Sequence, residues 1–360
     1  MLMETLSRWI GGVNDVLWTY VLVAALLGCA VWFTLRTRGV QFRLLGEMMR
    51  VLGESAGSGP KGERHVSSFQ AFAVSLASRV GTGNLAGVAT AIVVGGPGAV
   101  FWMWVIALVG AASAFVESTL AQLYKRRGRD SFIGGPAYYM ERGLGRRWMG
   151  VLFAVLISVT FGFAFNSVQS NTICAAWEGA FGADHVWVGV VLTALTLLII
   201  FGGIRRIARV SGVIVPIMAL GYIVLALGVV VINYRRFPAV LASIVGGAFD
   251  PQAVTGGAIG SVFLSMQKGV SRGIFSNEAG LGTGSIAHAC ADTRKPVKQG
   301  MFGIFEVFAD TIVICTLTAM VILCSGTPVN YGTAAGAELT ISGFTTTYGG
   351  WACLLYTSPS

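Results

Sequence analysis

A glycine-rich segment with polar neighbours interrupts the second long apolar run of the chain. The segment Gly81-Thr82-Gly83-Asn84 lies about fourteen residues after Ser68, where the run begins, and this is near the middle of a membrane at ~1.5 Å per residue. An interrupted membrane helix has free N–H groups that can bind an anion and free carbonyls that can bind a cation. The segment could therefore hold a carboxylate and a metal ion side by side. The alternative is that the glycines only allow close helix packing.

The seventh apolar run contains a similar interruption. Its glycine and polar residues lie within 267–282, and the same depth argument predicts the break at 269–273. Because five runs separate it from the second, the two interrupted runs enter the membrane from opposite sides. Such an inverted pair is typical of secondary transporters, which bind their substrate between the two segments. The Gly-Thr-Gly triplet recurs at residues 282–284, beyond the expected break, and we interpret this recurrence as coincidental.

Several ionisable residues fall inside apolar runs, where each charge costs at least ~2.5 kcal/mol. Glu306 and Asp310 share one face of the eighth run at i, i+4 spacing. These carboxylates could bind a cation or relay protons, and the alternative is that they form internal salt bridges with Arg79 and Arg272. The other candidates in apolar runs are Glu117, Lys268 and Glu278.

Amide side chains occur in the fourth run, at Asn166, Gln169 and Asn171. Gln169 could contact a ligand, and the alternative is that all three amides form hydrogen bonds between helices. The six cysteines stand singly and the three histidines are scattered, so no disulfide framework, zinc site or catalytic triad is indicated. We therefore predict neither an enzymatic activity nor a cofactor.

The elements that would position these residues are membrane helices. Of the 360 residues, 54% are hydrophobic and 11% are charged, whereas soluble proteins have about 25% charged residues. A spanning helix needs about 20 mostly apolar residues. Eight runs approximately qualify: 16–35, 68–94, 100–123, 150–175, 186–200, 210–232, 258–289 and 300–324. A ninth run begins near Tyr348 and stops at Ser360.

The net charge of +9 is explained by the orientation of these helices. If the N-terminus lies outside the cell, 19 of the 25 Lys and Arg residues fall in the inner loops, as the positive-inside rule requires. Nucleic-acid binding is therefore not predicted. We expect a multi-pass protein of a bacterial cell membrane, with the lipid bilayer as its surroundings and its N-terminus outside.

The segment Gly95 to Gly110, with the sequence GGPGAVFWMWVIALVG, resembles the signature of the alanine or glycine:cation symporter family, the sodium:alanine symporters. Further similar segments are Arg79 to Gly87, Gly134 to Tyr139, Ser276 to Gly282 and Asp310 to Thr316, and the resemblance extends to about Cys353. The resemblance implies a secondary active transporter that carries alanine, glycine or both into the cell, with sodium as the coupling ion.

The resemblance also implies a fold. This is an all-α fold of two inverted repeats of five helices, of the bacterial leucine transporter type, with one extra N-terminal helix. The extra helix would span 16–35, the first repeat 68–232 and an incomplete second repeat 258–353. Residues 354–360 do not resemble the family, and we expect them to be a non-native tail after a C-terminal truncation. The oligomeric state is not predicted.

Site residues follow from the same resemblance. The substrate would contact Thr82, Gly83, Phe165, Gln169, Gly269, Gly273, Phe275, Ser276 and Asn277. Sodium would be bound by Gly81, Asn84, Asp310 and Thr311. Two alternatives remain open: a proton-coupled amino-acid carrier that uses Glu306 or Asp310, and a channel, scaffold or truncated fragment that does not transport.

Overall fold

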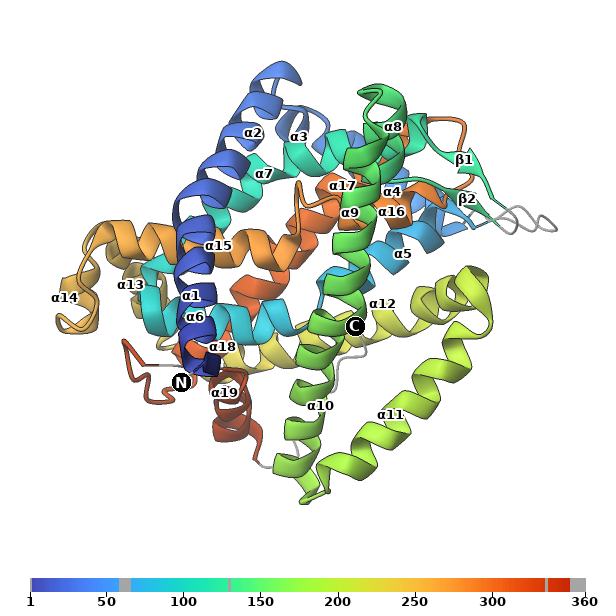
Figure 1. Ribbon diagram of the computed structural model, residues 1–360. Helices are drawn as coiled ribbons and strands as arrows, with labels where there is room; N and C mark the ends of the chain where they lie inside the picture. Colours follow the sequence, from blue (N-terminus) through green and yellow to red (C-terminus); the bar gives the residue numbers. More distant parts are fainter. Residues whose placement is uncertain (1, 58–65, 129–130, 334–335, 350–360) are drawn as a thin grey trace.

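The computed structural model describes residues 2–57, 66–128, 131–333 and 336–349, and this part of the chain is almost entirely helical (Figure 1). Four stretches within it are long and apolar enough to cross a membrane: Gly98–Leu123, Arg147–Glu178, Arg206–Ile232 and Pro296–Cys324. Shorter apolar helices cover Tyr20–Arg36, Gly83–Gly95, His185–Ile200 and Phe237–Phe249. The prediction of an all-α polytopic membrane protein is confirmed.

The chain begins with five helical segments, and the long stretch at 2–36 lies along one side of the bundle (Figure 1). In chain order they are α1 (Leu2–Val16), the π-helical segment η1 (Leu17–Leu22), α2 (Val23–Arg36), α3 (Val40–Arg43) and α4 (Leu45–Gly57). Helix α2 packs against α7 (Gly98–Leu123). Helix α1 exposes large apolar residues such as Trp9 and Ile10, as a helix in contact with lipid does.

The second apolar run is a broken helix, as predicted. Helix α5 (Ser68–Arg79) begins with a capping box between Ser67 and Gln70, which satisfies two backbone N–H groups of its first turn. The helix stops at Val80, whose backbone is extended. The chain becomes helical again in the π-helical segment η2 (Gly83–Gly87) and continues as α6 (Val88–Gly95).

The middle of the chain forms a hairpin and then a group of helices at the edge of the bundle (Figure 1). The hairpin pairs β1 (Arg126–Arg127) with β2 (Phe132–Ile133) in antiparallel register, with Arg126 opposite Ile133. The helices are α8 (Pro136–Gly143), α9 (Arg147–Val159), η3 (Thr160–Phe165), α10 (Asn166–Phe181), α11 (His185–Ile200) and α12 (Gly203–Ile232). Most of their apolar side chains are exposed, so these helices present a wide surface to lipid.

The seventh apolar run is also broken, but the predicted break at 269–273 is wrong. After α13 (Phe237–Phe249) and α14 (Pro251–Thr255), helix α15 (Val262–Asn277) is continuous, and α16 (Thr283–Ala289) follows a non-helical segment at 278–282. Gly269 and Gly273 lie inside α15 and face α7. A Cβ atom on Gly273 would lie 2.6 Å from Ile106 Cγ2, so these two glycines allow two helices to pack closely.

The two broken helices run antiparallel to each other. The half-helix α16 packs against α5, while α15 packs against η2 and α6. At the crossing, a Cβ atom on Gly83 would lie only 3.2 Å from Ser276 Cα. The second half of each broken helix begins within a Gly-Thr-Gly triplet, since η2 starts at Gly83 and α16 starts at Thr283. The two triplets occupy equivalent positions, so the interpretation of the repeated triplet as coincidental is wrong.

The eighth run forms one long helical stretch. It consists of α17 (Pro296–Val307), the π-helical segment η4 (Phe308–Cys315) and α18 (Thr316–Cys324). Several helices lie outside the predicted runs, among them the short apolar α13 and, near the end of the described chain, α19 (Glu338–Tyr348). Tyr348 ends a helix instead of beginning one. The remainder of the ninth run and the predicted tail, at 350–360, lie outside the described residues.

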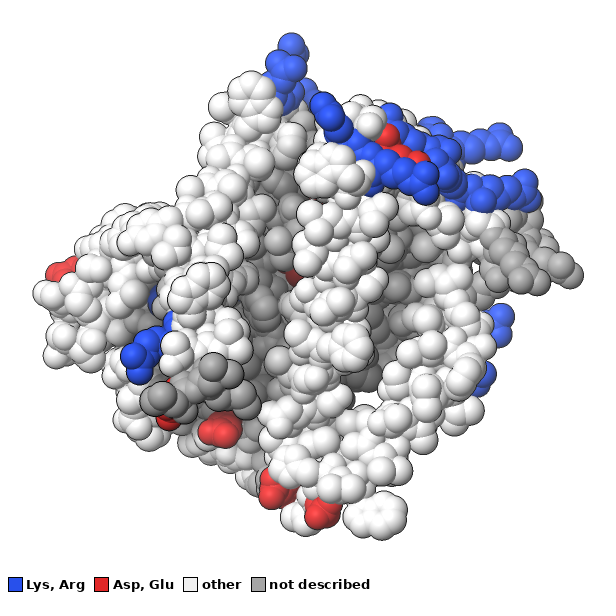
Figure 2. Space-filling view, viewed as in Figure 1, with Lys and Arg blue, Asp and Glu red and all other residues white. Residues whose placement is uncertain are grey.

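Charged side chains are unevenly distributed over the surface. Figure 2 shows that Lys and Arg gather at the end of the molecule where α8, β1 and β2 lie, while acidic side chains occur at the opposite end, near the turn between α10 and α11. The broad surface between the two ends is almost uncharged in this view. This separation of charge along one axis is typical of a protein that spans a membrane.

The packing of α15 on α7 can be tested with Gly273→Ala. The added methyl group has no space against Ile106 and Met103, and overpacking of this kind costs about 1–3 kcal/mol. We expect a lower midpoint of thermal unfolding for the detergent-solubilised protein. The matched control is Gly221→Ala in α12, where the new Cβ would meet no atom within 4 Å. Equal stability of the two variants would contradict the close packing.

Candidate functional site

A cavity of about 150 Å³ lies at the break between α5 and η2. Its walls come from that break, from η3 and α10, and from the end of α15. The lining residues are Ser78, Arg79, Gly81, Thr82, Gly83, Phe161, Phe165, Asn166, Gln169, Phe275 and Glu278. Pockets for drug-sized ligands measure about 300–1,000 Å³, so this cavity suits a molecule of only a few heavy atoms.

The two breaks place helix ends of opposite polarity beside the cavity. Thr82 and Gly83 begin a helical segment, and the first N–H groups of a helix have no partner within it. Helix α15 ends at Asn277, where the last carbonyls are unpaired in the same way. Because the helix dipole favours an anion at the first end and a cation at the second, the arrangement suits a zwitterion.

Stacked aromatic rings form the apolar wall of the cavity. Phe161 and Phe165 stack with ring centroids 4.5 Å apart and an interplanar angle of 4°. Phe165 stacks in turn on Phe275 of α15, at 5.6 Å and 23°. The wall therefore joins η3 to the broken seventh run, and it limits the size of a side chain that could enter.

A buried polar cluster surrounds Asp310 of η4, next to the cavity. One carboxylate oxygen accepts a hydrogen bond of 2.6 Å from Asn84 Nδ2. The other accepts hydrogen bonds of 2.9 Å from Ser276 Oγ and of 2.9 Å from Thr311 Oγ1. All four side chains are almost inaccessible to solvent, so the carboxylate depends on these neighbours for its hydrogen bonds.

The donor set of this cluster matches the chemistry of a small hard cation. The carboxylate and the two hydroxyls supply oxygen ligands, which such cations prefer, and the hydroxyl hydrogens can rotate away when a cation is present. Asn277 Nδ2 donates to Thr311 Oγ1 at 3.2 Å and so positions that hydroxyl. Within the described residues there is no group of three His, Cys, Asp or Glu side chains that could hold a transition metal.

Asn84 connects the cluster to the cavity. Its Oδ1 accepts a 2.8 Å hydrogen bond from the backbone N–H of Gly81, a cavity residue. Its Nδ2 donates to Asp310. A ligand that moves the Gly81 backbone would therefore also move the side chain that holds Asp310.

The structure brings together most of the residues predicted for the site. Of the predicted substrate residues, those that line the cavity are Thr82, Gly83, Phe165, Gln169 and Phe275. Ser276 and Asn277 instead belong to the Asp310 cluster, and Gly269 and Gly273 lie away from the cavity, against α7. Of the predicted sodium residues, Asn84, Asp310 and Thr311 form the cluster, while Gly81 lines the cavity.

Some residues of the site were not predicted for it. Ser78, Phe161 and Asn166 line the cavity, and only their positions near Arg79, Phe165 and Gln169 could have indicated this. Glu278 was noted as a charge inside an apolar run, but not as a cavity residue. Its Oε2 accepts a hydrogen bond from Thr283 Oγ1.

A second buried cluster, centred on Arg79, adjoins the cavity. Arg79 Nη2 lies 3.4 Å from Glu306 Oε2 and 3.8 Å from Glu117 Oε1. Ser75 Oγ donates to Glu306 Oε2 at 2.7 Å. The alternative in which Glu306 pairs with Arg79 is thus confirmed. Arg272 instead lies over the ring of Phe275, 5.9 Å from its centre.

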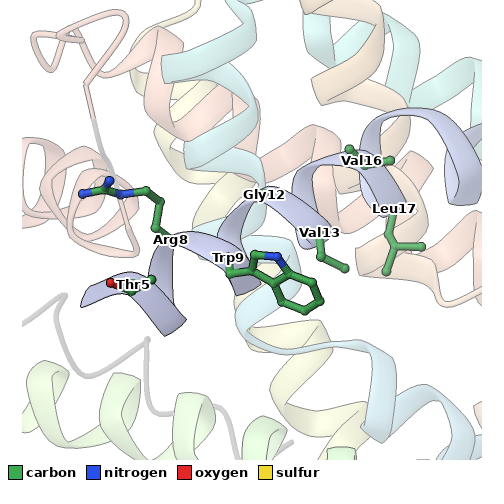
Figure 3. A pocket seen from close by; sticks show the side chains of 7 residues that line it. All are labelled: Thr5, Arg8, Trp9, Gly12, Val13, Val16 and Leu17. Atoms are coloured by element: carbon green, nitrogen blue, oxygen red, sulfur yellow. The ribbon is translucent and has the colours of Figure 1, made fainter. Parts of the chain in front are cut away.

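A larger hollow of about 540 Å³ lies along α1 and η1. Figure 3 shows that all of its labelled side chains come from this one helical stretch. They are mostly apolar, and Trp9 is 72% exposed. This hollow is a groove on an outer surface without a converging set of polar groups, so it is not a candidate binding site.

The Arg79 cluster can be tested with Arg79→Gln. Removing one partner of a buried ion pair costs about 3–5 kcal/mol, because it leaves buried charges without a counterion. We expect a marked fall in the midpoint of thermal unfolding. The control is Arg50→Gln in the exposed pair with Glu47, which is expected to cost about 0–1 kcal/mol. An Arg79 variant as stable as the control would contradict the pairing.

Comparison with known proteins identifies relatives across most of this chain. Residues 3–358 match the model of the sodium:alanine symporter family, so the match extends beyond Cys353. The probable sodium/glutamine symporter GlnT of Bacillus subtilis is 49% identical over 97% of this chain and 72% of its own length. The amino-acid carrier protein AlsT of the same organism is 51% identical over 94% of this chain and 70% of its own length.

A more distant relative comes from an archaeon. The sodium/alanine symporter AgcS of Methanococcus maripaludis is 38% identical over 92% of this chain and 74% of its own length. These proteins are transporters and not enzymes, in agreement with the prediction. The long apolar helices, the two broken helices and these matches together lead to one conclusion: the chain belongs to the sodium:alanine symporter family.

Proposed function

We propose that this chain is a sodium-coupled symporter that brings alanine, glycine or both into the cell. The observation that carries this proposal is the side chain of Asn84, which bonds a cavity residue through one atom and Asp310 through the other. A substrate site and a cation site that share a side chain can influence each other's affinity. This mutual influence is what coupled transport requires.

In this proposal the substrate is bound as a zwitterion. Its carboxylate accepts hydrogen bonds from the N–H groups at the start of η2, at Thr82 and Gly83, and from the Thr82 hydroxyl. Its ammonium group lies near the end of α15, where unpaired carbonyls and the Glu278 carboxylate, a cavity residue, are available. Gln169 contacts the substrate from α10.

The coupling ion is sodium, bound beside Asp310. Its ligands are the carboxylate of Asp310, the hydroxyls of Ser276 and Thr311, and oxygens near Gly81 and Asn84. These side chains already contact one another. Sodium would neutralise Asp310 and draw η2, α15 and η4 together, which would order the cavity for the substrate.

The transport cycle in this proposal uses an inverted-repeat fold of the leucine transporter type. The antiparallel packing of the two broken helices supports this, with the first repeat at 68–232 and the second beginning near 258. One group of helices would rock against the other around the fixed site. The N-terminus would lie outside a bacterial cell membrane, so that the end of the molecule rich in Lys and Arg (Figure 2) faces the cytoplasm.

The small cavity and its aromatic wall favour alanine or glycine over a longer side chain. One relative is named for glutamine and another for alanine, so the family name does not determine the substrate. Here Phe161, Phe165 and Phe275 enclose one side of a cavity of about 150 Å³. We therefore propose small neutral amino acids as the preferred substrates.

The proposed function can be tested by uptake of labelled alanine into proteoliposomes. An inward sodium gradient is expected to drive uptake above the equilibrium level, and excess unlabelled alanine or glycine is expected to compete more strongly than glutamine. Uptake that is independent of the sodium gradient but driven by a pH gradient would contradict sodium coupling. It would favour the proton-coupled alternative that uses Glu306 or Asp310.

The role of Asn84 can be tested with Asn84→Ala. The variant removes the hydrogen bond that positions the Asp310 carboxylate, and hydrogen bonds to charged groups contribute about 1.5–3 kcal/mol. If this energy is lost from sodium binding, the sodium concentration for half-maximal uptake is expected to rise about tenfold or more. The matched control is Asn233→Ala at the end of α12, whose amide donates to the Val229 carbonyl. A variant at Asn84 with unchanged sodium dependence would remove this residue from the cation site.

A further inference from the structure

His288 is a fully buried histidine that the proposed transport mechanism does not use. It lies on α16, the half-helix that follows the second break, and it is 0% exposed. Its Nδ1 lies 2.6 Å from Gln299 Oε1, and its Nε2 lies 3.1 Å from Glu306 Oε1. Both ring nitrogens therefore lie close to oxygen atoms. Only the contact of Nδ1 has the geometry of a hydrogen bond, since among the described residues His288 Nε2 and Glu306 Oε1 are buried without a hydrogen-bond partner.

With the side-chain oxygen of Gln299 facing the ring, as it does in the structure, this arrangement needs a proton beyond those of a neutral imidazole. A neutral histidine carries an N–H group on one nitrogen and a lone pair on the other. With acceptor oxygens on both sides, the lone pair would face an oxygen lone pair. The repulsion is removed when His288 is an imidazolium, or when Glu306 carries the proton and donates it to His288.

The charges of the interior lead to the same requirement. Among the described residues, the buried acidic side chains are Glu117, Glu278, Glu306 and Asp310, and Arg79 is the one buried basic side chain besides His288. A sodium ion at Asp310 would balance one carboxylate and Arg79 another. Two buried carboxylates then remain, and because buried charges without a counterion are costly, they need further positive charges or protons.

Charged groups face the pair from each neighbouring element. Arg79 contacts Glu306 from α5, and Glu117 of α7 contacts Arg79. Glu278 and Asp310 lie farther away, in the second break and in η4. Among the described residues, further titratable groups near α16 are Tyr139 of α8, Cys290 and Asp292. Lys125 lies beside α16 but donates to Gln122 and to the Ala291 carbonyl, so it does not serve as the counterion of Glu306.

We propose that His288 and Glu306 form a proton-binding site that regulates the opening of the transporter toward the cytoplasm. The site connects four segments, because α5 and α7 contribute Arg79 and Glu117 while α16 and α17 contribute the pair itself. With the proton bound, two positive and two negative charges balance in this cluster. This inference rests on the proposed function, which supplies the transport assay and the orientation of the protein in the membrane.

Loss of the proton leaves one negative charge uncompensated between the four segments. Their packed arrangement is then less stable, and they separate more easily on the side of the Lys- and Arg-rich loops. A higher cytoplasmic pH should therefore speed the release of substrate and sodium.

The experiment measures initial sodium-driven alanine uptake in right-side-out membrane vesicles. The internal pH is varied between about 6 and 8 and the external pH is held constant. We expect uptake by the wild-type protein to rise about threefold or more over this range, since one linked proton can change a population by up to about tenfold per pH unit. A wild-type rate independent of internal pH would overturn the inference, because it would mean that His288 stays neutral with the Gln299 amide turned around.

Two variants fix the charge of the cluster in opposite ways. His288→Gln lacks the proton at every pH, so its uptake is expected to stay at the high-pH level of the wild type. Glu306→Gln removes the negative charge, so its uptake is expected to stay at the low-pH level. The control is His185→Gln, because this histidine is 45% exposed at the start of α11, and it should keep the wild-type profile.

The outcomes separate this inference from the proposed function. A pH profile in His288→Gln as steep as that of the wild type would overturn the proton site and leave sodium symport intact. Absence of sodium-dependent uptake in the wild type at every pH would overturn the proposed function itself. Size-exclusion chromatography of both variants verifies that they fold. If neither folds, the wild-type profile alone decides the inference.

Discussion

Two helices that stop inside an apolar core must find partners for the backbone N–H groups that their breaks expose. Lipid cannot supply these partners, so the protein around the breaks has to provide them. The N–H of Gly81 donates to Asn84 Oδ1 at 2.8 Å, and that of Ala279 donates to Asn277 Oδ1 at 3.0 Å. The N–H of Gly282 donates to Glu117 Oε2 at 2.9 Å. Both breaks are therefore held by buried polar side chains from the sequence around them or from α7.

Each of these side chains has a second polar group that also needs a partner in the interior. The Asn84 amide reaches Asp310, the Asn277 amide reaches Thr311, and the second oxygen of Glu117 faces Arg79. Two clusters result: one consists of neutral polar side chains around Asp310, and the other contains the charged side chains of Arg79, Glu117 and Glu306. The cavity lies beside both, so the same constraint that stabilises the breaks also generates the candidate site.

Much of the fold could be predicted from the sequence, because long apolar runs and the Gly81–Asn84 interruption are strong local signals. The position of the second break could not be predicted from depth. Gly269 and Gly273 are glycines that make room for α7, and their role is visible only when α7 is in place. The break lies instead at 278–282, where Glu278, Gly280 and Gly282 adopt positive φ. Helix α13 was missed because thirteen residues are too few for a span.

The site was also predicted only in part, because some of its residues have a local sequence signal and others depend on how the helices pack. Residues on or next to the first break, such as Thr82 and Asn84, could be identified because their sequence is unusual for a membrane helix. Ser276 was predicted for the substrate, but its hydroxyl turns toward Asp310, and this depends on the rotation of α15 about its axis. His288 carried no signal in the sequence, since a single histidine acquires its partners only through the packing of α16 against α17.

We propose that Asn84 couples a substrate cavity to a cation site at Asp310. The most direct test is equilibrium binding of alanine to the purified protein at several sodium concentrations, together with binding of sodium at several alanine concentrations. We expect each ligand to raise the affinity for the other by the same factor, as thermodynamic linkage requires, and Asn84→Ala to bring this factor close to one. Alanine affinity independent of sodium in the wild-type protein would show that the two sites are not coupled.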